Sequence, residues 1–519
     1  MKIGMETGPD TAMETATQTA TQTGTQTGIG AEALRPGARP GPFVKRALIG
    51  VVAGCVVLGG VLVLLPSERH RTVPPAPGPV ARAMTAVGAG APAALPDLAV
   101  LIRDREAQLR AHPRDEQSWA VLGTAYVERA RRTAAPVYYP KAEKALRTSL
   151  RVRPKGNVAA LDGLAALANA RGDFVAGLKW AGAAAQAAPK RWTTYPLLID
   201  SYTGLGDYRA TRRALDKLLD LRTGPTVMAR AAGVYRDRGW REDAAAALAD
   251  ATALARTPAE QAACLEQAGQ LAWERGDAEE SLRHYEAALR TDPGEQGALA
   301  GQGRALAALG RTPQALHAYQ RALAGRPEPR YTLELGELYE ASGLGGAARA
   351  QYDVLRARVR AAAAAGVNGD LLLGLFEADH GDPAAAVRLL RAEWQRRPGI
   401  AVADALGWAL HRAGEDEEAL GFAERAMDKE HGGGVRSALY AYHRGQIERD
   451  LDRAGPARRH LAEALRINPY FSPLFVPLAK AALVSLGEPA AEGPAEPETR
   501  PGSSDGPQRP NGPERGASR

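Results

Sequence analysis

The sequence predicts an all-α protein in which a single transmembrane helix precedes a solenoid of paired helices. Small and aromatic residues recur at intervals of 33 or 34 residues through most of the chain, as expected for a helical repeat array. Alanine supplies much of the 45% apolar content and only 5% of residues are aromatic, which suits closely packed helices better than one large core. Near the N-terminus, an apolar run without charge has the length of a membrane span.

Three segments of the chain lack the pattern of a packed structure. Residues 1–44 contain a low-complexity run in which threonine alternates with alanine or glutamine, and we expect them to be disordered. Residues 67–97 are rich in proline, alanine and glycine, which predicts an extended linker. Residues 487–519 are rich in proline, glycine and glutamate and are expected to form a disordered tail.

Residues 45–66 are expected to form the transmembrane helix. The uncharged run from Ala47 to Leu65 would span roughly 28 Å as a helix, close to the thickness of the hydrocarbon core. Within it, the sequence Val52-Ala53-Gly54-Cys55 resembles the lipid-attachment motif of bacterial lipoproteins. However, the apolar stretch before the motif is short and the run continues beyond the cysteine. An uncleaved anchor therefore fits these residues better than a lipidated or cleaved N-terminus.

The charges beside the apolar run predict its orientation in the cell membrane. Four basic residues precede it and three follow it: Arg35, Arg39, Lys45 and Arg46 against Arg69, Arg71 and Arg82. The positive-inside rule then places the N-terminus in the cytoplasm and the repeats outside it. Gly50 and Gly54 form a GxxxG motif that can support a homodimer, although glycine is also common in transmembrane helices for other reasons.

Residues 98–486 carry the repeats. One set of five positions recurs 34 residues later: Gly269, Gly276, Tyr285, Ala288 and Pro293 become Gly303, Gly310, Tyr319, Ala322 and Pro327. Phasing the chain on such positions predicts about ten helix pairs, which begin near 116, 158, 192, 225, 262, 296, 329, 367, 400 and 438. A lone helix over 98–113 and a closing helix over 470–486 would cap the two ends.

Four Gly-Asp dipeptides mark the turns inside the pairs: Gly172-Asp173, Gly206-Asp207, Gly276-Asp277 and Gly381-Asp382. In each, we expect the glycine to end the first helix with a positive φ. The aspartate is expected to cap the second helix. Glu280 stands three residues after Asp277, the spacing of a capping box.

These repeats resemble the tetratricopeptide repeat (TPR) family, most clearly where Trp119, Leu122, Gly123 and Tyr126 follow its W-x₂-L-G-x₂-Y pattern. The resemblance implies a right-handed α-solenoid of 34-residue units. It also implies that small residues such as Gly269 let the helices of a pair approach closely, while Tyr285 and its equivalents fill the space between units. The excess of arginine over lysine, with much alanine, glycine and proline, is typical of a GC-rich bacterial genome.

The resemblance further implies that the concave surface, formed by the first helix of each unit, binds a protein partner. By repeat phase, this surface includes seven candidate partner-binding residues: Glu266, Gln270, Trp273, Arg304, Glu337, Trp408 and His411. The two tryptophans are candidate anchors for a peptide, or else each packs between neighbouring units. The lysine clamp with which some TPR proteins bind a C-terminal carboxylate is absent, because acidic residues replace it at Asp162, Glu266 and Asp404.

The sequence contains no convincing sign of catalysis, a cofactor or a metal site. A G-x-S-x-G match at 502–506 and an HGGG match at 431–434 fall in a tail and a loop, not in the strand-turn-helix that a nucleophile elbow requires. Cys55 and Cys264 lack metal-ligand spacing and are not expected to pair in a disulfide. The net charge of +7 is spread along the chain, so nucleic-acid binding is not predicted.

The sequence therefore favours a membrane-anchored TPR scaffold that binds a membrane or envelope protein in its concave groove. Two alternatives remain open at this point. The chain could be an accessory assembly or secretion factor for membrane or exported clients. It could also be an accessory subunit of a transporter or of an enzyme that makes an envelope polymer.

Overall fold

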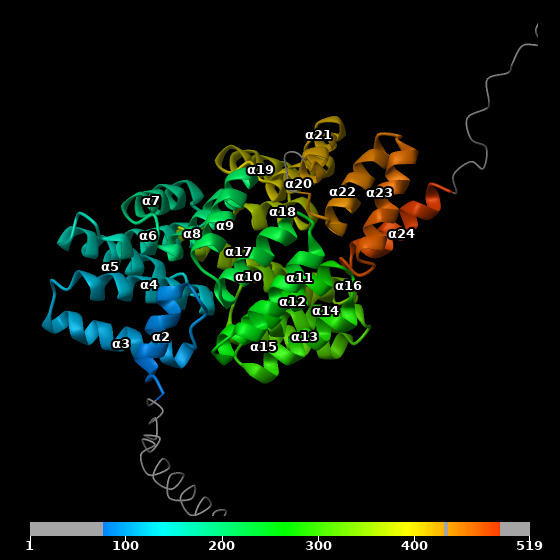
Figure 1. The fold of residues 1–519 in the computed structure, drawn as a ribbon. Helices are drawn as coiled ribbons and strands as arrows, with labels where there is room; N and C mark the ends of the chain where they lie inside the picture. Colours follow the sequence, from blue (N-terminus) through cyan, green and yellow to red (C-terminus); the bar gives the residue numbers. More distant parts are fainter. Residues whose placement is uncertain (1–75, 430–433, 488–519) are drawn as a thin grey trace, which may run out of the picture. The chain divides into compact units, whose positions relative to one another are not determined.

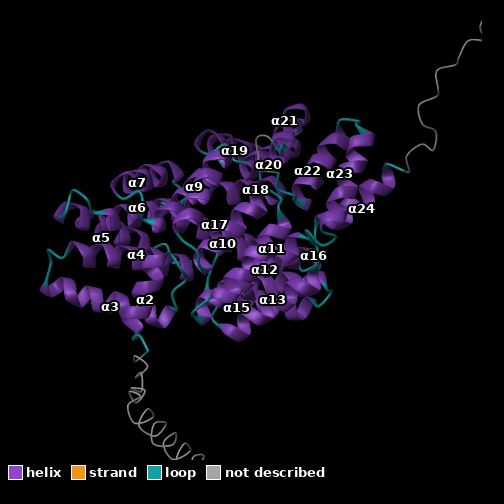
Figure 2. Ribbon diagram, viewed as in Figure 1, coloured by secondary structure: helices purple, strands orange, loops and turns teal. Residues whose placement is uncertain are grey.

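The computed structural model describes residues 76–429 and 434–487. From Pro77 onward, they belong to one compact unit. The described residues form α-helices and one short 3₁₀ helix, with no strand among them (Figure 2). The all-α prediction is therefore confirmed for this part of the chain.

The first two helices are α2 (Pro79–Ala89) and α3 (Leu95–Ala111). The prediction of an extended linker over 67–97 is wrong where α2 forms. Ala83 and Val87, one helical turn apart, are buried in the same cluster as Leu98 of α3. A proline at the start of α2 and Gly90 with φ +65° after its end supply the helix boundaries.

Ten consecutive helix pairs follow (Figure 1), and their first helices begin within four residues of the starts expected from the repeat phase. A last helix, α24 (Phe475–Ser485), ends the described chain. The pairs are α4 (Glu116–Thr133) with α5 (Tyr138–Val152), α6 (Val158–Ala170) with α7 (Phe174–Ala187), α8 (Tyr195–Gly204) with α9 (Tyr208–Leu221), α10 (Pro225–Asp237) with α11 (Arg241–Leu254), α12 (Pro258–Glu274) with α13 (Ala278–Thr291), α14 (Gln296–Ala308) with α15 (Thr312–Gly325), α16 (Pro329–Ala341) with α17 (Gly345–Ala364), α18 (Asp370–His380) with α19 (Pro383–Arg396), α20 (Ile400–Arg412) with α21 (Asp416–Met427), and α22 (Ala438–Asp450) with α23 (Ala454–Ile467).

Glycine and tyrosine set the close packing within and between pairs, as the repeat pattern predicts. A Cβ atom on Gly269 would lie 2.7 Å from the ring of Tyr285, and one on Gly303 would lie 2.8 Å from the ring of Tyr319. Tyr285 is also covered by the next pair, where a Cβ on Gly301 would lie 2.2 Å from its ring. The buried ring of Tyr285 therefore fills the space between two glycines of successive units.

The turns inside the pairs follow the Gly-Asp prediction in part. The glycines at 172, 206 and 276 have positive φ, and the aspartates at 173, 207 and 382 accept a backbone N–H at the start of the second helix. Gly381 departs from the prediction with φ −141°, because the Glu377 carboxylate binds the next backbone N–H at 3.2 Å. Asp277 makes no cap hydrogen bond; its carboxylate faces Arg275 at 3.5 Å, and Glu280 faces side chains of its own helix instead.

Successive turns of the solenoid touch each other through polar contacts between residues about 195 positions apart. Asn468 Nδ2 donates to the carbonyl oxygen of Trp273 at 2.7 Å, over a separation of 195 residues. The backbone N–H of Ile400 donates to the Tyr208 hydroxyl at 3.1 Å, 192 residues away. The connections inside the early pairs therefore lie against the loops that precede α20 and the closing helix.

Glycine is required at this contact between turns. Gly239 has φ +75°, and a Cβ atom there would lie 2.4 Å from the carbonyl oxygen of Gly434. A residue with a side chain would have to push the two turns apart. The positive φ of these glycines thus serves the contact between turns as well as the local turn.

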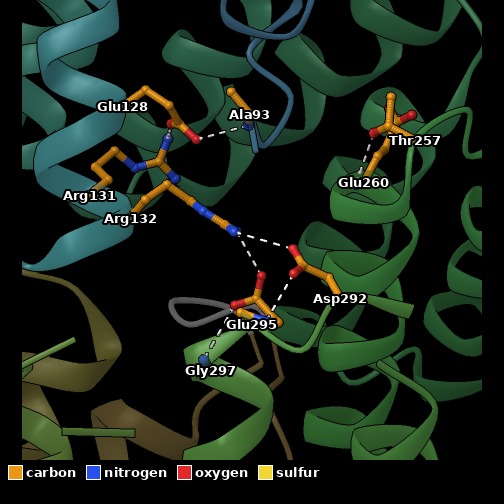
Figure 3. A network of polar contacts seen from close by, with 10 residues as sticks. Ala93, Glu128, Arg131, Arg132, Thr257, Glu260, Asp292, Glu295 and Gly297 are labelled. Carbon is orange, nitrogen blue, oxygen red and sulfur yellow. Dashed lines mark hydrogen bonds and ion pairs between the residues drawn. The ribbon is translucent and has the colours of Figure 1, made fainter. Parts of the chain in front are cut away.

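An arginine of the first pair joins the solenoid's first turn to the middle of the repeat array. Figure 3 shows Arg132 of α4 extending toward Asp292 and Glu295, between α13 and α14. Its guanidinium donates to Glu295 Oε2 at 2.7 Å and lies 3.7 Å from Asp292 Oδ2. Both Arg132 and Glu295 are largely buried, so this ion pair is screened less than a surface pair.

Several predictions concern residues outside the described ranges. They are the disordered segment 1–44, the membrane helix 45–66 with Gly50 and Gly54, Cys55, and the tail beyond Gly487. Within the described ranges, the helices are all too short or too polar to cross a bilayer.

Candidate functional site

The concave side of the solenoid encloses two adjoining cavities. The first has a volume of about 820 Å³. Its walls are α10, α12, α14 and the start of α16 on one side, and the starts of α20 and α22 from the next solenoid turn on the other. Four predicted partner-binding residues line it: Glu266, Gln270, Trp273 and Arg304.

The second cavity, of about 860 Å³, shares Trp273 and Arg304 with the first and extends toward α16, α18 and α22. Glu337, a fifth predicted residue, lines it. Both volumes lie in the range of ligand-binding pockets. The repeat pattern alone predicts an open groove. The contact between successive solenoid turns closes this groove into cavities.

Arg304 organises the wall between the two cavities. Its guanidinium lies 5.7 Å from the centre of the Trp273 ring, donates to Gln270 Oε1 at 2.6 Å and reaches Glu334 Oε1 at 2.8 Å. The Tyr319 hydroxyl donates to the other oxygen of Glu334 at 2.9 Å. Although burial opposes its charge, Arg304 holds the pKa of Glu334 below its usual value. The indole of Trp273 is thus held in place from one face by a charged network.

Glu266 differs from the other acidic residues of the first cavity. Within the described residues, its carboxyl group makes no hydrogen bond or ion pair. Burial, and next the charge of Glu295, raise its pKa to about 7, although Arg304 acts in the opposite direction. At neutral pH the group can therefore accept or donate a hydrogen bond to something that enters the cavity.

Tyr440 lines both cavities from the start of α22, in the second solenoid turn. Its hydroxyl has no hydrogen-bond partner among the described residues, and burial raises its pKa well above the usual value. The repeat pattern does not point to this residue. The repeat phase assigns residues within one turn, whereas Tyr440 reaches the site only because the second turn packs against the first.

Comparison with known proteins supports the repeat assignment. Residues 266–327 and 300–366 match the family model of the tetratricopeptide repeat. These residues are tetratricopeptide repeats. No curated protein matches the chain.

Several solved structures resemble the TPR array. The human IFIT1 dimer with PPP-AAAA is 18% identical, with a TM-score of 0.40, over 60% of this chain and 72% of that chain. The human IFIT1 dimer with m7Gppp-AAAA is 17% identical, with a TM-score of 0.42, over 63% and 76%. A tetratricopeptide repeat protein from Parabacteroides merdae is 18% identical, with a TM-score of 0.29, over 50% and 98%.

Two residues that the TPR phase placed on the concave surface do not line either cavity. Trp408 is 3% exposed, donates from Nε1 to Asp379 Oδ1 at 2.8 Å and stacks on His443 at 4.2 Å between ring centres. It therefore packs between neighbouring helix pairs, which is the alternative to a peptide anchor that the sequence left open for this tryptophan. His411 lies outside the cavities because its Nδ1 binds Asp416 Oδ1 at 2.5 Å.

Residues 76–429 and 434–487 hold no group of three metal-binding side chains. Cys264 is a free, buried thiol, and burial raises its pKa to about 12, so it is protonated and unreactive at neutral pH. What the cavities offer chemically is recognition: one aromatic ring, a carboxyl group and a hydroxyl without internal partners, and a set of paired charges.

Proposed function

We propose that this protein is a membrane-anchored TPR scaffold that binds a segment of a partner polypeptide in the two cavities. TPR repeats generally mediate protein–protein interactions. The proposal rests on a contrast in the first cavity between charged groups that have partners and polar groups that do not. Most of its charged groups are paired, whereas Glu266 and the Tyr440 hydroxyl beside Trp273 lack partners. Both groups line the cavity and are free to form hydrogen bonds with the backbone or a side chain of a bound polypeptide.

The membrane anchor in this proposal is the apolar run 45–66, and the partner is a membrane or envelope protein on the outer side. A reporter fused after Leu486 tests the orientation. A reporter that is active only outside the cytoplasm should be active there, because four basic residues precede the run and three follow it. Activity of a reporter that works only in the cytoplasm would reverse the orientation and remove envelope proteins as partners.

Binding in the cavity is tested by capture of the partner with a variant that changes few atoms. The double variant Glu266→Gln, Tyr440→Phe removes a carboxylate and a hydroxyl and keeps the volumes of both side chains. We expect partner recovery from the membrane fraction to fall by about tenfold, because both groups bind within the cavity. The matched control is Glu279→Gln, which changes an exposed glutamate of α13 outside the cavities.

The control should recover the partner as the unchanged protein does. Equal recovery by the double variant, with a melting temperature that is not lowered, would contradict binding in the first cavity. A lowered melting temperature would be resolved with the two single variants, since Tyr440→Phe removes no hydrogen bond that the described residues make.

A further inference from the structure

Besides Glu334, three acidic residues line the second cavity. Glu337 and Asp379 line it with 22% and 14% of their side chains exposed, and Asp404 lies buried beside them. Their close partners are aromatic nitrogens. The Trp408 indole donates to Asp379, His443 Nδ1 lies 3.0 Å from Asp404 Oδ1, and His380 Nε2 lies 3.8 Å from Glu337 Oε1.

The arginines that line this cavity do not pair with these three carboxyl groups. Arg304 and Arg330 both pair with Glu334, at 2.8 and 3.1 Å. Arg397 pairs with Glu393. Arg412 approaches Asp379 at 3.9 Å but is not part of the cavity wall.

The electrostatic cost of this arrangement appears in the two accessible carboxyl groups. Burial raises the pKa of both Glu337 and Asp379. The charge of Asp379 adds to the rise at Glu337, although His380 acts against it. Burial lowers the pKa of His380, but Glu337, Glu340 and Asp379 raise it overall, so His380 supplies part of the compensating charge. A further positive charge beside these carboxyl groups would be poorly screened.

Much of the remaining lining of the second cavity is apolar and aromatic. Leucines from α16, α18 and α22 line it together with rings from α18 and from the segment before α24, among them Leu333, Leu371, Leu375, Leu439, Phe376 and Phe471. Aromatic faces attract cations, and aliphatic walls accept apolar side chains. A lining that combines carboxyl groups with apolar side chains suits a basic group that is carried on an apolar segment.

We propose that the second cavity binds a lysine or arginine side chain of the partner polypeptide, flanked by apolar residues that pack against its walls. This inference rests on the proposed binding of a polypeptide and adds the chemistry of the bound segment. The chain's own C-terminal tail does not fit. Residues 488–519 contain arginines but, apart from proline, no aliphatic or aromatic side chain larger than alanine.

The test uses the full-length chain in lipid nanodiscs and short, fluorescein-labelled apolar peptides. The peptides differ only at a central lysine, norleucine or glutamate, and binding is followed by fluorescence anisotropy, with empty nanodiscs to measure partition into lipid. We expect the lysine peptide to bind about tenfold more tightly than the norleucine peptide, and the glutamate peptide to bind most weakly. Glu337→Gln should remove most of the lysine preference, and Glu279→Gln should leave it unchanged.

The inference would be overturned by no binding of the lysine peptide, by equal binding of the norleucine peptide, or by an unchanged lysine preference in Glu337→Gln. A charge-reversed profile, with the glutamate peptide bound best, would overturn it as well. The proposed function has its own readout, since partner capture depends on Glu266 and Tyr440 in the first cavity. If the lysine preference is absent but partner capture still depends on Glu266 and Tyr440, only the inference about a basic side chain is refuted, and the proposed function stands.

Discussion

Replacing Gly301 by alanine is expected to lower the free energy of unfolding by about 1–3 kcal/mol, as overpacking of a filled core does. The added Cβ would lie 2.2 Å from Cζ of Tyr285. The ring cannot move away, because it is 1% exposed and a Cβ on Gly269 would lie 2.7 Å from it on another side. Chemical denaturation measures the loss, and hydrogen exchange should locate it in α13 and α14.

The matched control for this prediction is Gly182→Ala in α7, where a Cβ meets no atom within 4 Å. There the same change should raise stability by up to about 1 kcal/mol, because alanine favours a helix more than glycine does. Replacing the Tyr285 ring with a smaller side chain, in the double variant Gly301→Ala, Tyr285→Leu, should recover part of the lost stability. If Gly301→Ala were as stabilising as Gly182→Ala, the packing of Tyr285 between successive units would be refuted.

The second large effect is the pH dependence caused by Glu266. The pKa of Glu266 in the folded protein is about 7, against 4.5 for an ordinary glutamate. The folded state therefore binds this proton more tightly than the unfolded state. Its contribution to stability is complete below pH 4.5 and is lost as the pH rises through 7.

Glu266→Gln should therefore flatten the fall in stability between pH 4.5 and pH 7. At pH 8 we expect the variant to be more stable than the unchanged protein by about 1–2 kcal/mol. The full shift corresponds to about 3 kcal/mol, and water in the cavity reduces it. Denaturation midpoints across this pH range give the comparison, with Glu279→Gln as the control. Parallel curves for Glu266→Gln and the control would show that Glu266 titrates normally.

The fold could be predicted closely wherever the sequence encodes local packing. Gly269 and Tyr285, repeated at 34 residues, determine how the helices of a pair approach, so the starts of the pairs follow from the pattern. Helix α2 was missed because proline, alanine and glycine around it resemble a linker. The spacing of Ala83 and Val87 is that of one helix face, but this face is buried only because α3 packs against it.

The candidate site was predictable within one solenoid turn and not beyond it. Repeat phase brought Glu266, Trp273 and Glu337 to the cavities because it assigns the concave face of each first helix. Tyr440 could not be predicted as a cavity residue, because the position of the second solenoid turn is the sum of many small rotations between pairs. No single residue specifies that sum. Trp408 was misplaced for a related reason, since α22 places His443 over its ring.

The most direct test of the central claim is photo-crosslinking in intact cells from inside the first cavity. A benzophenone amino acid is placed at Gln267, which lines that cavity, and in a separate strain at Glu279 on the outer surface. The proposed function predicts a crosslinked partner polypeptide from position 267 and none from position 279. The absence of a crosslink at 267, or the same crosslinked product from both positions, would contradict binding inside the solenoid.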